Sequence, residues 1–291
     1  MKIGIGLPNS VPGTSGQTML GWARLAETRG FSTLGTIGRI AYPTYDSLIA
    51  LAAAAGATER IGLMTDILLG PTYQPVVLAK MAASLDQLSG GRFRLGVSVG
   101  SREDDYELVG VNYHRRGRLW DEALELMHQA WRCERIPGSS HPITPRPTNG
   151  ESVPIMVGGN SDAALRRVPK WGVGWTVGGS AAPMAAPLIE RVRVTWQEAG
   201  RPGQPQITAL AYFGLGEQAD VAIREYISSY YGYIGAYAVT LAERVPRTSK
   251  AIRETIRAFD EIGVDELIFF PTSHDLEQVR LLAGVALEAR A

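Results

Sequence analysis

The strongest local signal for chemistry is Gly158-Gly159-Asn160-Ser161, which follows the apolar run PIMV and precedes the helix-like run DAALRRV. Two glycines would let the backbone approach a ligand closely. A helix that begins here would offer free N–H groups and the positive end of its dipole to an anion such as a phosphate. An ordinary strand-to-helix turn with a serine cap explains the same residues, and the pattern is neither GxGxxG nor a Walker loop.

Two further side chains could act on a ligand directly. Arg39, in the run TIGRI, could hold a carboxylate, sulfonate or phosphate in a forked hydrogen bond. An ion pair with a neighbouring acid would explain this arginine equally well. His274 follows the last predicted strand, and we take Arg39 and His274 as the candidate catalytic residues.

The sequence lacks the usual patterns of acid–base or metal catalysis. No Ser-His-Asp order, His/Cys metal spacing or paired-carboxylate spacing stands out, so we expect no metal site. Residues 100–106 (GSREDDY) are dense in charge, and some of them should line a site because they follow a predicted strand. So few acid–base candidates suggest that a bound cofactor carries the chemistry.

The elements that would position these residues alternate along the chain. Short β-branched runs and longer helical stretches follow one another, which is typical of parallel βα units. Eight strands can close a barrel, so the sequence predicts an α/β fold, a TIM (β/α)8 barrel; a doubly wound open sheet is the competing fold. The predicted strands span residues 2–7, 33–37, 61–69, 93–99, 154–157, 174–177, 206–213 and 266–270. The predicted helices span residues 17–29, 46–55, 75–88, 116–132, 184–199 and 276–289, with another that begins near Ser161.

Two segments do not fit a bare barrel. Residues 135–153 are rich in proline and glycine and read as a loop. Residues 220–245 read as a long helical segment, and we expect it to form a mobile lid because long insertions after barrel strands usually serve the site. It carries five tyrosines, at positions 226, 230, 231, 233 and 237. We see no linker that would divide the chain, so we expect one domain over residues 1–291.

Composition narrows the classes of function. The 29 basic residues balance the 29 acidic ones, which argues against a nucleic-acid or anionic-membrane partner. The single cysteine, Cys133, cannot form an internal disulfide and fits a reducing cytoplasm. No apolar run approaches the length of a membrane helix, and the first residues do not resemble a signal peptide. We therefore expect a cytoplasmic protein that acts on a small molecule.

Three stretches resemble a known family, the bacterial luciferase-like monooxygenases, or luciferase-like flavin-dependent oxidoreductases. Residues 78–131 are similar to the family's block in which LSGGR leads into the fourth strand, which ends here in GVSVG. Residues 154–175 (PIMVGGNSDAALRRVPKWGVGW) resemble its flavin-phosphate segment. Residues 261–271 (EIGVDELIFFP) resemble its last strand.

The resemblance implies a TIM barrel with an insertion after strand 7, which residues 220–245 match in position. It also implies reduced FMN, or the related deazaflavin coenzyme, with the flavin ring in the barrel mouth. The positions that would bind the cofactor are Asp66 and Ile67 against the ring, Gly100 and Ser101 beside it, and Gly158, Gly159, Asn160 and Ser161 around the phosphate. A cis peptide bond not involving proline is expected at Asp66–Ile67.

One departure from the family pattern concerns the second strand. Many members carry an Asp-His pair after it, whereas this chain has Gly38 and Arg39. A Gly-Arg pair is similar to the alkanesulfonate monooxygenase branch, but the cysteine that follows it there is missing. The resemblance therefore does not support a mechanism that uses that histidine.

The leading hypothesis is a monooxygenase that uses reduced FMN and dioxygen on a small organic substrate. The alternatives are a deazaflavin-dependent hydride-transfer oxidoreductase and a non-catalytic flavin-binding protein. A flavin reductase is the expected protein partner, and the resemblance implies a homodimer.

Overall fold

The short apolar runs of the sequence form parallel strands that close into a barrel. The computed structural model describes residues 1–287. Its strands pair in the order β3-β2-β1-β9-β8-β7-β6-β5-β4, and a further pairing between β3 and β5 closes the ring. The strands are β1 (Lys2–Gly6), β2 (Thr33–Thr36), β3 (Gly62–Thr65), β4 (Leu68–Leu69), β5 (Phe93–Ser98), β6 (Ile155–Gly158), β7 (Gly174–Val177), β8 (Gln206–Phe213) and β9 (Glu266–Pro271). Since β3 and β4 are two parts of one barrel strand, the prediction of an eight-stranded TIM barrel is confirmed.

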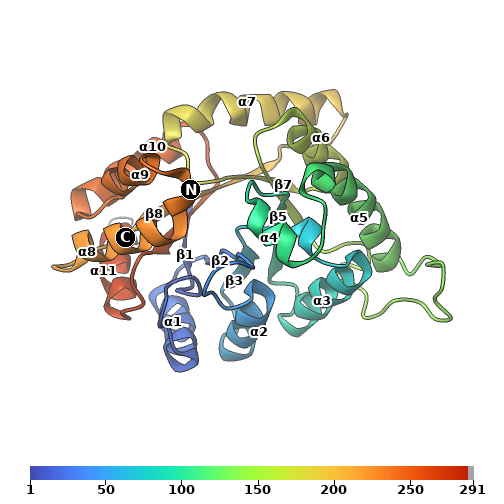
Figure 1. Cartoon of the computed structure of the whole chain (residues 1–291), viewed down its shortest axis with the longest axis horizontal. Helices are drawn as coiled ribbons and strands as arrows, with labels where there is room; N and C mark the ends of the chain where they lie inside the picture. Colours follow the sequence, from blue (N-terminus) through green and yellow to red (C-terminus); the bar gives the residue numbers. More distant parts are fainter. Residues whose placement is uncertain (288–291) are drawn as a thin grey trace.

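Helices surround the barrel, as Figure 1 shows. The outer ring is α1 (Gly16–Arg29), α2 (Ser47–Ala57), α3 (Pro75–Leu88), α5 (Arg116–Trp131), α6 (Asp162–Trp171), α7 (Ala182–Glu198), α10 (Ser249–Glu261) and α11 (Glu277–Ala286). Local chemistry fixes their ends. The Asp46 carboxylate accepts the N–H groups of Leu48 and Ile49 at 2.9 Å and caps α2, whereas Gly30 ends α1 in the left-handed conformation that glycine adopts without strain.

Apolar side chains fill both faces of the barrel wall. Trp22, Trp120 and Trp131 are almost fully buried between helices and strands. Ile268 and Phe270 are buried in a second cluster that includes residues of the barrel interior. Burial of such a side chain contributes about 1.5–3 kcal/mol, so this packing holds the strands in register.

Polar residues occupy the interior at the amino ends of the strands. The Glu266 carboxylate accepts hydrogen bonds from Ser32 Oγ at 2.6 Å and Thr33 Oγ1 at 2.7 Å, and it forms an ion pair with Arg94. Burial alone would raise the pKa of Glu266, but the charge of Arg94 and these hydrogen bonds hold that pKa below its ordinary value. This end of the barrel therefore contains a satisfied, charged carboxylate.

Several elements differ from the sequence prediction. The strand predicted at residues 61–69 is interrupted, because a cis peptide bond at Asp66–Ile67 separates β3 from β4. That bond confirms the expectation drawn from the resemblance. Helices α4 (Glu103–Leu108) and α10 were not predicted, and the loop at residues 135–153 is confirmed (Figure 1). The last helix was predicted to reach residue 289; residues 288 and 289 lie outside the described part of the chain.

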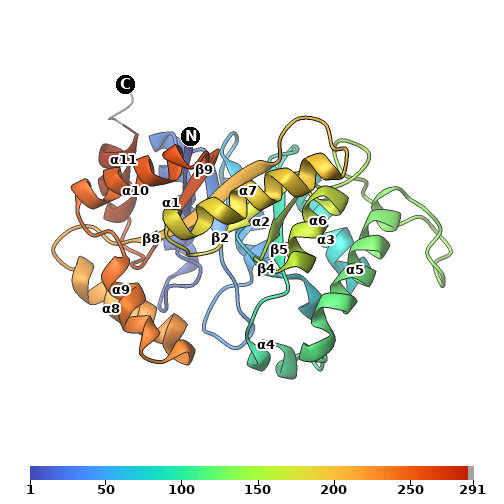
Figure 2. The ribbon, with the colours of Figure 1, turned by 90° about the horizontal axis from the view of Figure 1, so that it is seen from above.

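The insertion after β8, the seventh barrel strand, consists of two helices rather than one. They are α8 (Ala219–Tyr231) and α9 (Tyr237–Arg244), joined by the 3-10 turn η3 (Gly232–Ile234). Figure 2 shows α8, α9 and α4 at one end of the molecule, with the N-terminus at the other.

The two ends of this insertion are tied together. Arg247, which follows α9, forms an ion pair with Asp220 in α8 and donates Nη2–H to the Ala242 carbonyl at 2.6 Å. The Gly214 N–H, just after β8, donates to the Pro246 carbonyl at 3.3 Å. The segment thus leaves and rejoins the barrel at nearly the same point.

Candidate active site at the barrel mouth

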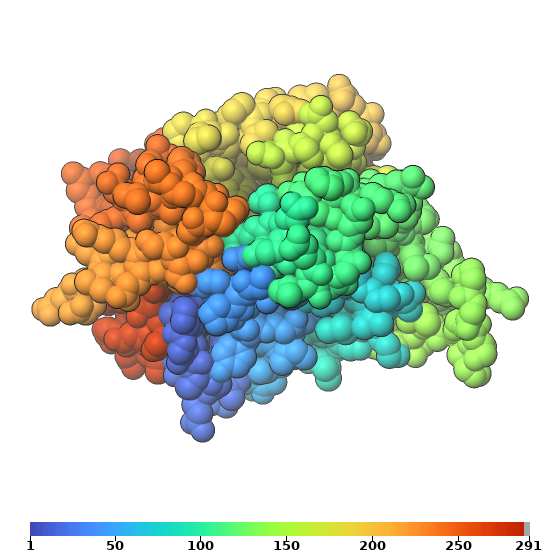
Figure 3. All heavy atoms as spheres, in the orientation of Figure 1, coloured from blue at the N-terminus to red at the C-terminus, as the bar shows by residue number. Residues whose placement is uncertain are grey.

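A cavity of about 990 Å³ opens at the carboxyl ends of the strands. Its floor and one wall come from the Asp66–Ile67 bulge and residues 100–102, and another wall comes from residues 178–184 after β7. The insertion supplies a third wall, including Tyr230, Tyr231 and Tyr233, and helix α10 extends the lining with residues between 251 and 259. In the space-filling view of Figure 3 the insertion, in orange, and the segment around α4, in green, lie side by side at the front of the molecule. The cavity is therefore placed where TIM-barrel enzymes bind their ligands.

Asp66 is buried in the floor of this cavity, with 3% of its surface exposed. Its Oδ1 accepts a hydrogen bond from Thr176 Oγ1 in β7 at 2.7 Å, whereas its Oδ2 has no hydrogen-bond partner among residues 1–287. Burial raises the pKa of Asp66 to about 7, although the Thr176 bond and the charge of Arg94 act in the opposite direction. This carboxyl group is therefore close to half-protonated at neutral pH.

Ile67 links the bulge to the glycine-rich turn. A Cβ atom added at Gly158 would lie 3.2 Å from Ile67 Cγ2, so the two residues are in contact. Gly159, Asn160 and Ser161 are exposed at the start of α6 and lie outside the cavity lining.

The turn itself has the features expected of an anion site. Gly159 has a φ of 104°, a conformation that favours glycine, and the Ser161 Oγ accepts the Ala164 N–H at 3.2 Å. Its helix α6 has ten residues, so its amino end carries a dipole of useful size. The prediction that these residues hold a phosphate remains open.

Gly100 occupies a tight place beside the cavity. Its φ is 63°, and a Cβ atom there would lie 2.5 Å from Leu69 Cδ2, so only glycine fits without a shift of the neighbouring residues. The Gly100 carbonyl accepts a hydrogen bond from Arg116 Nε at 3.2 Å, and the Ser101 carbonyl accepts one from Tyr113 at 3.1 Å. Both predicted ring-side residues therefore line the cavity in a fixed loop.

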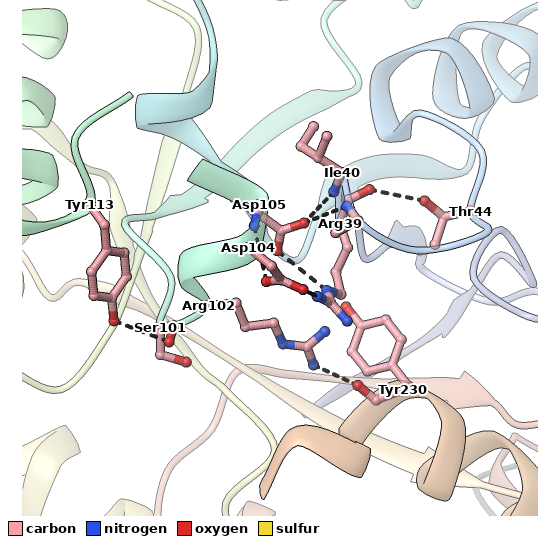
Figure 4. Close-up of polar contacts among 10 residues, drawn as sticks. Arg39, Ile40, Thr44, Ser101, Arg102, Asp104, Asp105, Tyr113 and Tyr230 are labelled. Carbon is pink, nitrogen blue, oxygen red and sulfur yellow. Dashed lines mark hydrogen bonds and ion pairs between the residues drawn. The ribbon is translucent and has the colours of Figure 1, made fainter. Parts of the chain in front are cut away.

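Arg39 also lines the cavity, but its guanidinium group is already paired. It forms ion pairs with Asp104 and with Asp105, the latter at 3.3 Å (Figure 4). Asp105 is fully buried, and its Oδ1 accepts the N–H groups of Ile40 and Ala41 at 2.7 Å each. The structural ion pair that the sequence left open is thus present, and Arg39 holds the loop after β2 against α4.

His274 does not join the other candidates. Its side chain is exposed and lies beside Gly13, in the loop after β1, and it is not part of the cavity lining. The structure thus gives this histidine no contact with the cavity that a catalytic role would require.

Arg102 is the residue of the site that sequence analysis did not single out. It donates Nη2–H to the Tyr230 carbonyl at 2.9 Å (Figure 4), and its guanidinium lies 4.5 Å from the Tyr230 ring centre and 4.3 Å from that of Tyr233. Such cation–π contacts are worth about 0.5–2 kcal/mol each. Arg102 therefore connects the loop after β5 to the insertion. The sequence contained two signals for this contact, the charge-dense run 100–106 and the tyrosines of the insertion, but neither indicates which residues meet.

Comparison with known proteins identifies the family. The family model for luciferase-like monooxygenases matches residues 1–266. This chain belongs to the luciferase-like monooxygenase family. It is therefore an enzyme. An uncharacterised protein of Mycobacterium tuberculosis is 32% identical over 222 residues, which cover 66% of this chain and 76% of that protein.

Two solved structures share the fold of this luciferase-like chain. The monooxygenase RslO1 from Streptomyces bottropensis has a TM-score of 0.81 and 22% identity over 100% of both chains. An F420-dependent secondary alcohol dehydrogenase, solved with an F420-acetone adduct, has a TM-score of 0.80 and 18% identity, covering 100% of this chain and 99% of its own. Within residues 1–287, no group of three or more His, Cys, Asp or Glu side chains could hold a metal ion. In that same range no helix has the length and apolar character to cross a membrane.

Proposed function

We propose that this enzyme is a flavin-dependent monooxygenase that uses reduced FMN and dioxygen to oxygenate a small organic substrate. The observation that carries the proposal is the large cavity at the barrel mouth, whose floor is the Asp66–Ile67 bulge, in a chain of the monooxygenase family. Its volume lies at the upper end of the range for ligand pockets. That volume is enough for a flat ring and a second small molecule.

The residues at the mouth fit an FMN group. Gly178 and Gly179 have no atom within 4 Å of a Cβ position, which leaves open space along one wall. Ile67 and Gly100 would lie against the ring, and the unpartnered Asp66 Oδ2 offers it a polar contact. The amino end of α6, with Ser161, would hold the phosphate, since backbone N–H groups and the helix dipole favour an anion there.

Bound reduced FMN would supply the electrons that activate dioxygen. The chain's own contribution is to position both reactants and to exclude water. The insertion covers the mouth with aromatic side chains, and its Tyr231 shares a hydrogen bond of 2.8 Å, hydroxyl to hydroxyl, with Tyr212 of strand β8. The organic substrate would lie between this wall and the flavin ring, and a flavin reductase would supply the reduced cofactor.

A second candidate is hydride transfer with a deazaflavin coenzyme. The likeness to the F420-dependent alcohol dehydrogenase supports it, because the same fold there binds F420. The monooxygenase family favours FMN, since the deazaflavin reacts poorly with oxygen.

The deciding experiment is an anaerobic titration of the full chain with reduced FMN and, in parallel, with reduced F420. We expect tighter binding of FMN and, with a flavin reductase, oxygen uptake that depends on the protein. The variant Gly100→Ala should lose binding, whereas Gly150→Ala, at another positive φ in the loop of residues 135–153, should retain it. Tight binding of F420 alone, without oxygen uptake, would establish the hydride-transfer alternative.

A further inference from the structure

We propose that Asp66 is the acid of the barrel mouth: its carboxyl group donates a hydrogen bond through Oδ2 to an acceptor atom of the molecule bound in the cavity. The ligand class is one that presents a carbonyl oxygen, a ring nitrogen or an enolate-like oxygen to the cavity floor. The inference rests on the proposed function only for the identity of that molecule, which is taken to be FMN.

The geometry around Asp66 leaves one carboxyl oxygen for this task. Oδ1 is already engaged by the Thr176 hydroxyl at 2.7 Å, and Oδ2 is buried without a partner among the described residues. A buried polar atom without a partner costs about 1–3 kcal/mol, so a ligand atom that pairs with Oδ2 would recover that energy. Because Asp66 lines the cavity, a ligand is the available source of the missing partner.

Burial, and not the charged groups around it, favours the neutral form of Asp66. Strands β2, β3, β4, β6 and β7 contribute no titratable side chain to the barrel wall. The charges that act on Asp66 are Arg94 from β5, which lowers its pKa, and Glu266 from β9, which raises it; Tyr212 from β8 is a buried titratable group in the same cavity lining. The positive charge of Arg94 is already paired with Glu266, so it compensates only part of the cost of ionising Asp66. With burial, these groups place the pKa of Asp66 at about 7.

The hydrogen-bond donors around Asp105 differ from those around Asp66. Asp105 is also fully buried in the wall of the cavity, but its oxygens accept two backbone N–H groups and an Arg39 N–H. Such donors stabilise a charged carboxylate. Asp66 has a single neutral donor, and that donor would stabilise the carboxylate formed if the proton passes to the ligand. In that transfer the Oδ2–H bond breaks and one bond to hydrogen forms on the ligand, so total charge is conserved.

The first test follows the carboxyl carbon of Asp66 by nuclear magnetic resonance in the ligand-free chain labelled with carbon-13 at aspartate. The Asp66→Asn variant assigns the signal. We expect a midpoint near pH 7 that moves to higher pH in Thr176→Val, because the Thr176 bond lowers the pKa. Thr272→Val removes a buried hydroxyl that donates to the Phe213 carbonyl, and it should leave the midpoint unchanged. A midpoint below pH 5, or no response to Thr176→Val, overturns the proposal.

The second test measures the affinity for reduced FMN between pH 6 and 8. Wild-type affinity should fall about tenfold as the donor is lost, since one such hydrogen bond is worth about 1–1.5 kcal/mol. Asp66→Asn keeps a donor that does not titrate, so its affinity should change only with the titration of FMN itself, whose phosphate has a pKa of about 6, and the tenfold fall should appear in the ratio of wild-type to Asp66→Asn affinity. A ratio that is constant with pH overturns Asp66 as the donor and leaves the proposed function intact. Another outcome is that FMN does not bind at any pH, while Asp66 still titrates near pH 7 and responds to Thr176→Val. In that case the proposed function is wrong, but the proposal that Asp66 is an acid at the barrel mouth is supported.

Discussion

Two buried carboxyl groups lie at opposite ends of the same barrel and have opposite properties. Glu266, at the amino ends of the strands, has an arginine and two hydroxyl donors, and its pKa is lowered. Asp66, at the mouth, has one hydroxyl donor and an unpartnered oxygen, and burial raises its pKa. At the amino ends of the strands, which we call the closed end, every hydrogen bond that Glu266 needs comes from the protein, and the group contributes to stability. At the mouth, which we call the open end, Asp66 Oδ2 needs a partner from a bound molecule.

The largest expected effect is the loss of unfolding free energy when the ion pair between Arg94 and Glu266 is removed. Arg94→Met leaves the Glu266 carboxylate buried without its counter-charge, and such a loss costs about 3–5 kcal/mol. Urea unfolding at pH 7 would measure it. The control is Arg191→Met, which breaks an exposed ion pair with Asp162 and should cost less than about 1 kcal/mol. Equal losses in the two variants would contradict the distinction drawn here.

At the barrel mouth, by contrast, replacing the buried Asp66 with asparagine should stabilise the protein. The folded chain keeps the Asp66 proton up to a pKa of about 7, whereas the unfolded chain releases it near the ordinary value of 3.8. Wild-type stability therefore falls as pH rises through this window, and the full penalty is present above pH 7. Asp66→Asn removes the penalty, so relative to wild type it should gain up to about 4 kcal/mol between pH 3.5 and pH 8.

Unfolding free energies of both proteins at several pH values would measure this gain. Glu266→Gln should show the opposite sign, because its lowered pKa gives stability that is present above the unfolded pKa and is lost in acid. A difference between Asp66→Asn and wild type that does not vary with pH would mean that Asp66 is charged in the folded chain.

Ser161→Asp tests the proposed phosphate site at the amino end of α6. Aspartate is as good an N-cap as serine, so the fold should be retained, but its charge would oppose a phosphate. We expect FMN to bind more weakly by about 1–3 kcal/mol. Ser15→Asp is the matched control, since Ser15 caps α1 in the same way through the Thr18 N–H at 3.0 Å. If both variants bind FMN as tightly as wild type, the phosphate lies elsewhere.

The smallest effect is expected for the contact between Arg102 and the insertion. Arg102→Met should reduce the protection of residues 219–244 from hydrogen exchange by about 1 kcal/mol, because it removes a hydrogen bond and three cation–π contacts. Arg118→Met, which breaks an exposed pair with Glu122, should leave that protection unchanged. Protection that is high and unchanged with and without FMN would rule out a mobile lid.

The periodicity of the sequence was sufficient to predict the barrel. Its strands are short apolar runs between helical stretches, and the order of such units determines a parallel closed sheet. The helical spacing of Ile252, Ile256 and Phe259 could also have predicted α10, which we missed. The short helix α4 could not be predicted in the same way, because four of its six residues are acidic and the segment is too short to show an apolar period.

The partners within the site could not be predicted from the sequence. Arg39 is paired with acids 65 and 66 residues away, and Arg102 contacts a carbonyl 128 residues away. Spacing along the chain does not determine which of many charged residues meet across a barrel mouth. The position of the cis bond at Asp66–Ile67 was available only through resemblance, because no property of the two side chains requires it.

The insertion after β8 leaves and rejoins the barrel at adjacent points. Since Gly214 and Pro246 are hydrogen-bonded neighbours and Arg247 clamps Asp220, the intervening segment can be exchanged without moving either β8 or α10. The floor of the cavity, with Asp66, and the glycine-rich turn beside it belong to the barrel and would stay in place. The proposed function therefore predicts that transplanting this one contiguous stretch of chain between relatives changes the substrate range.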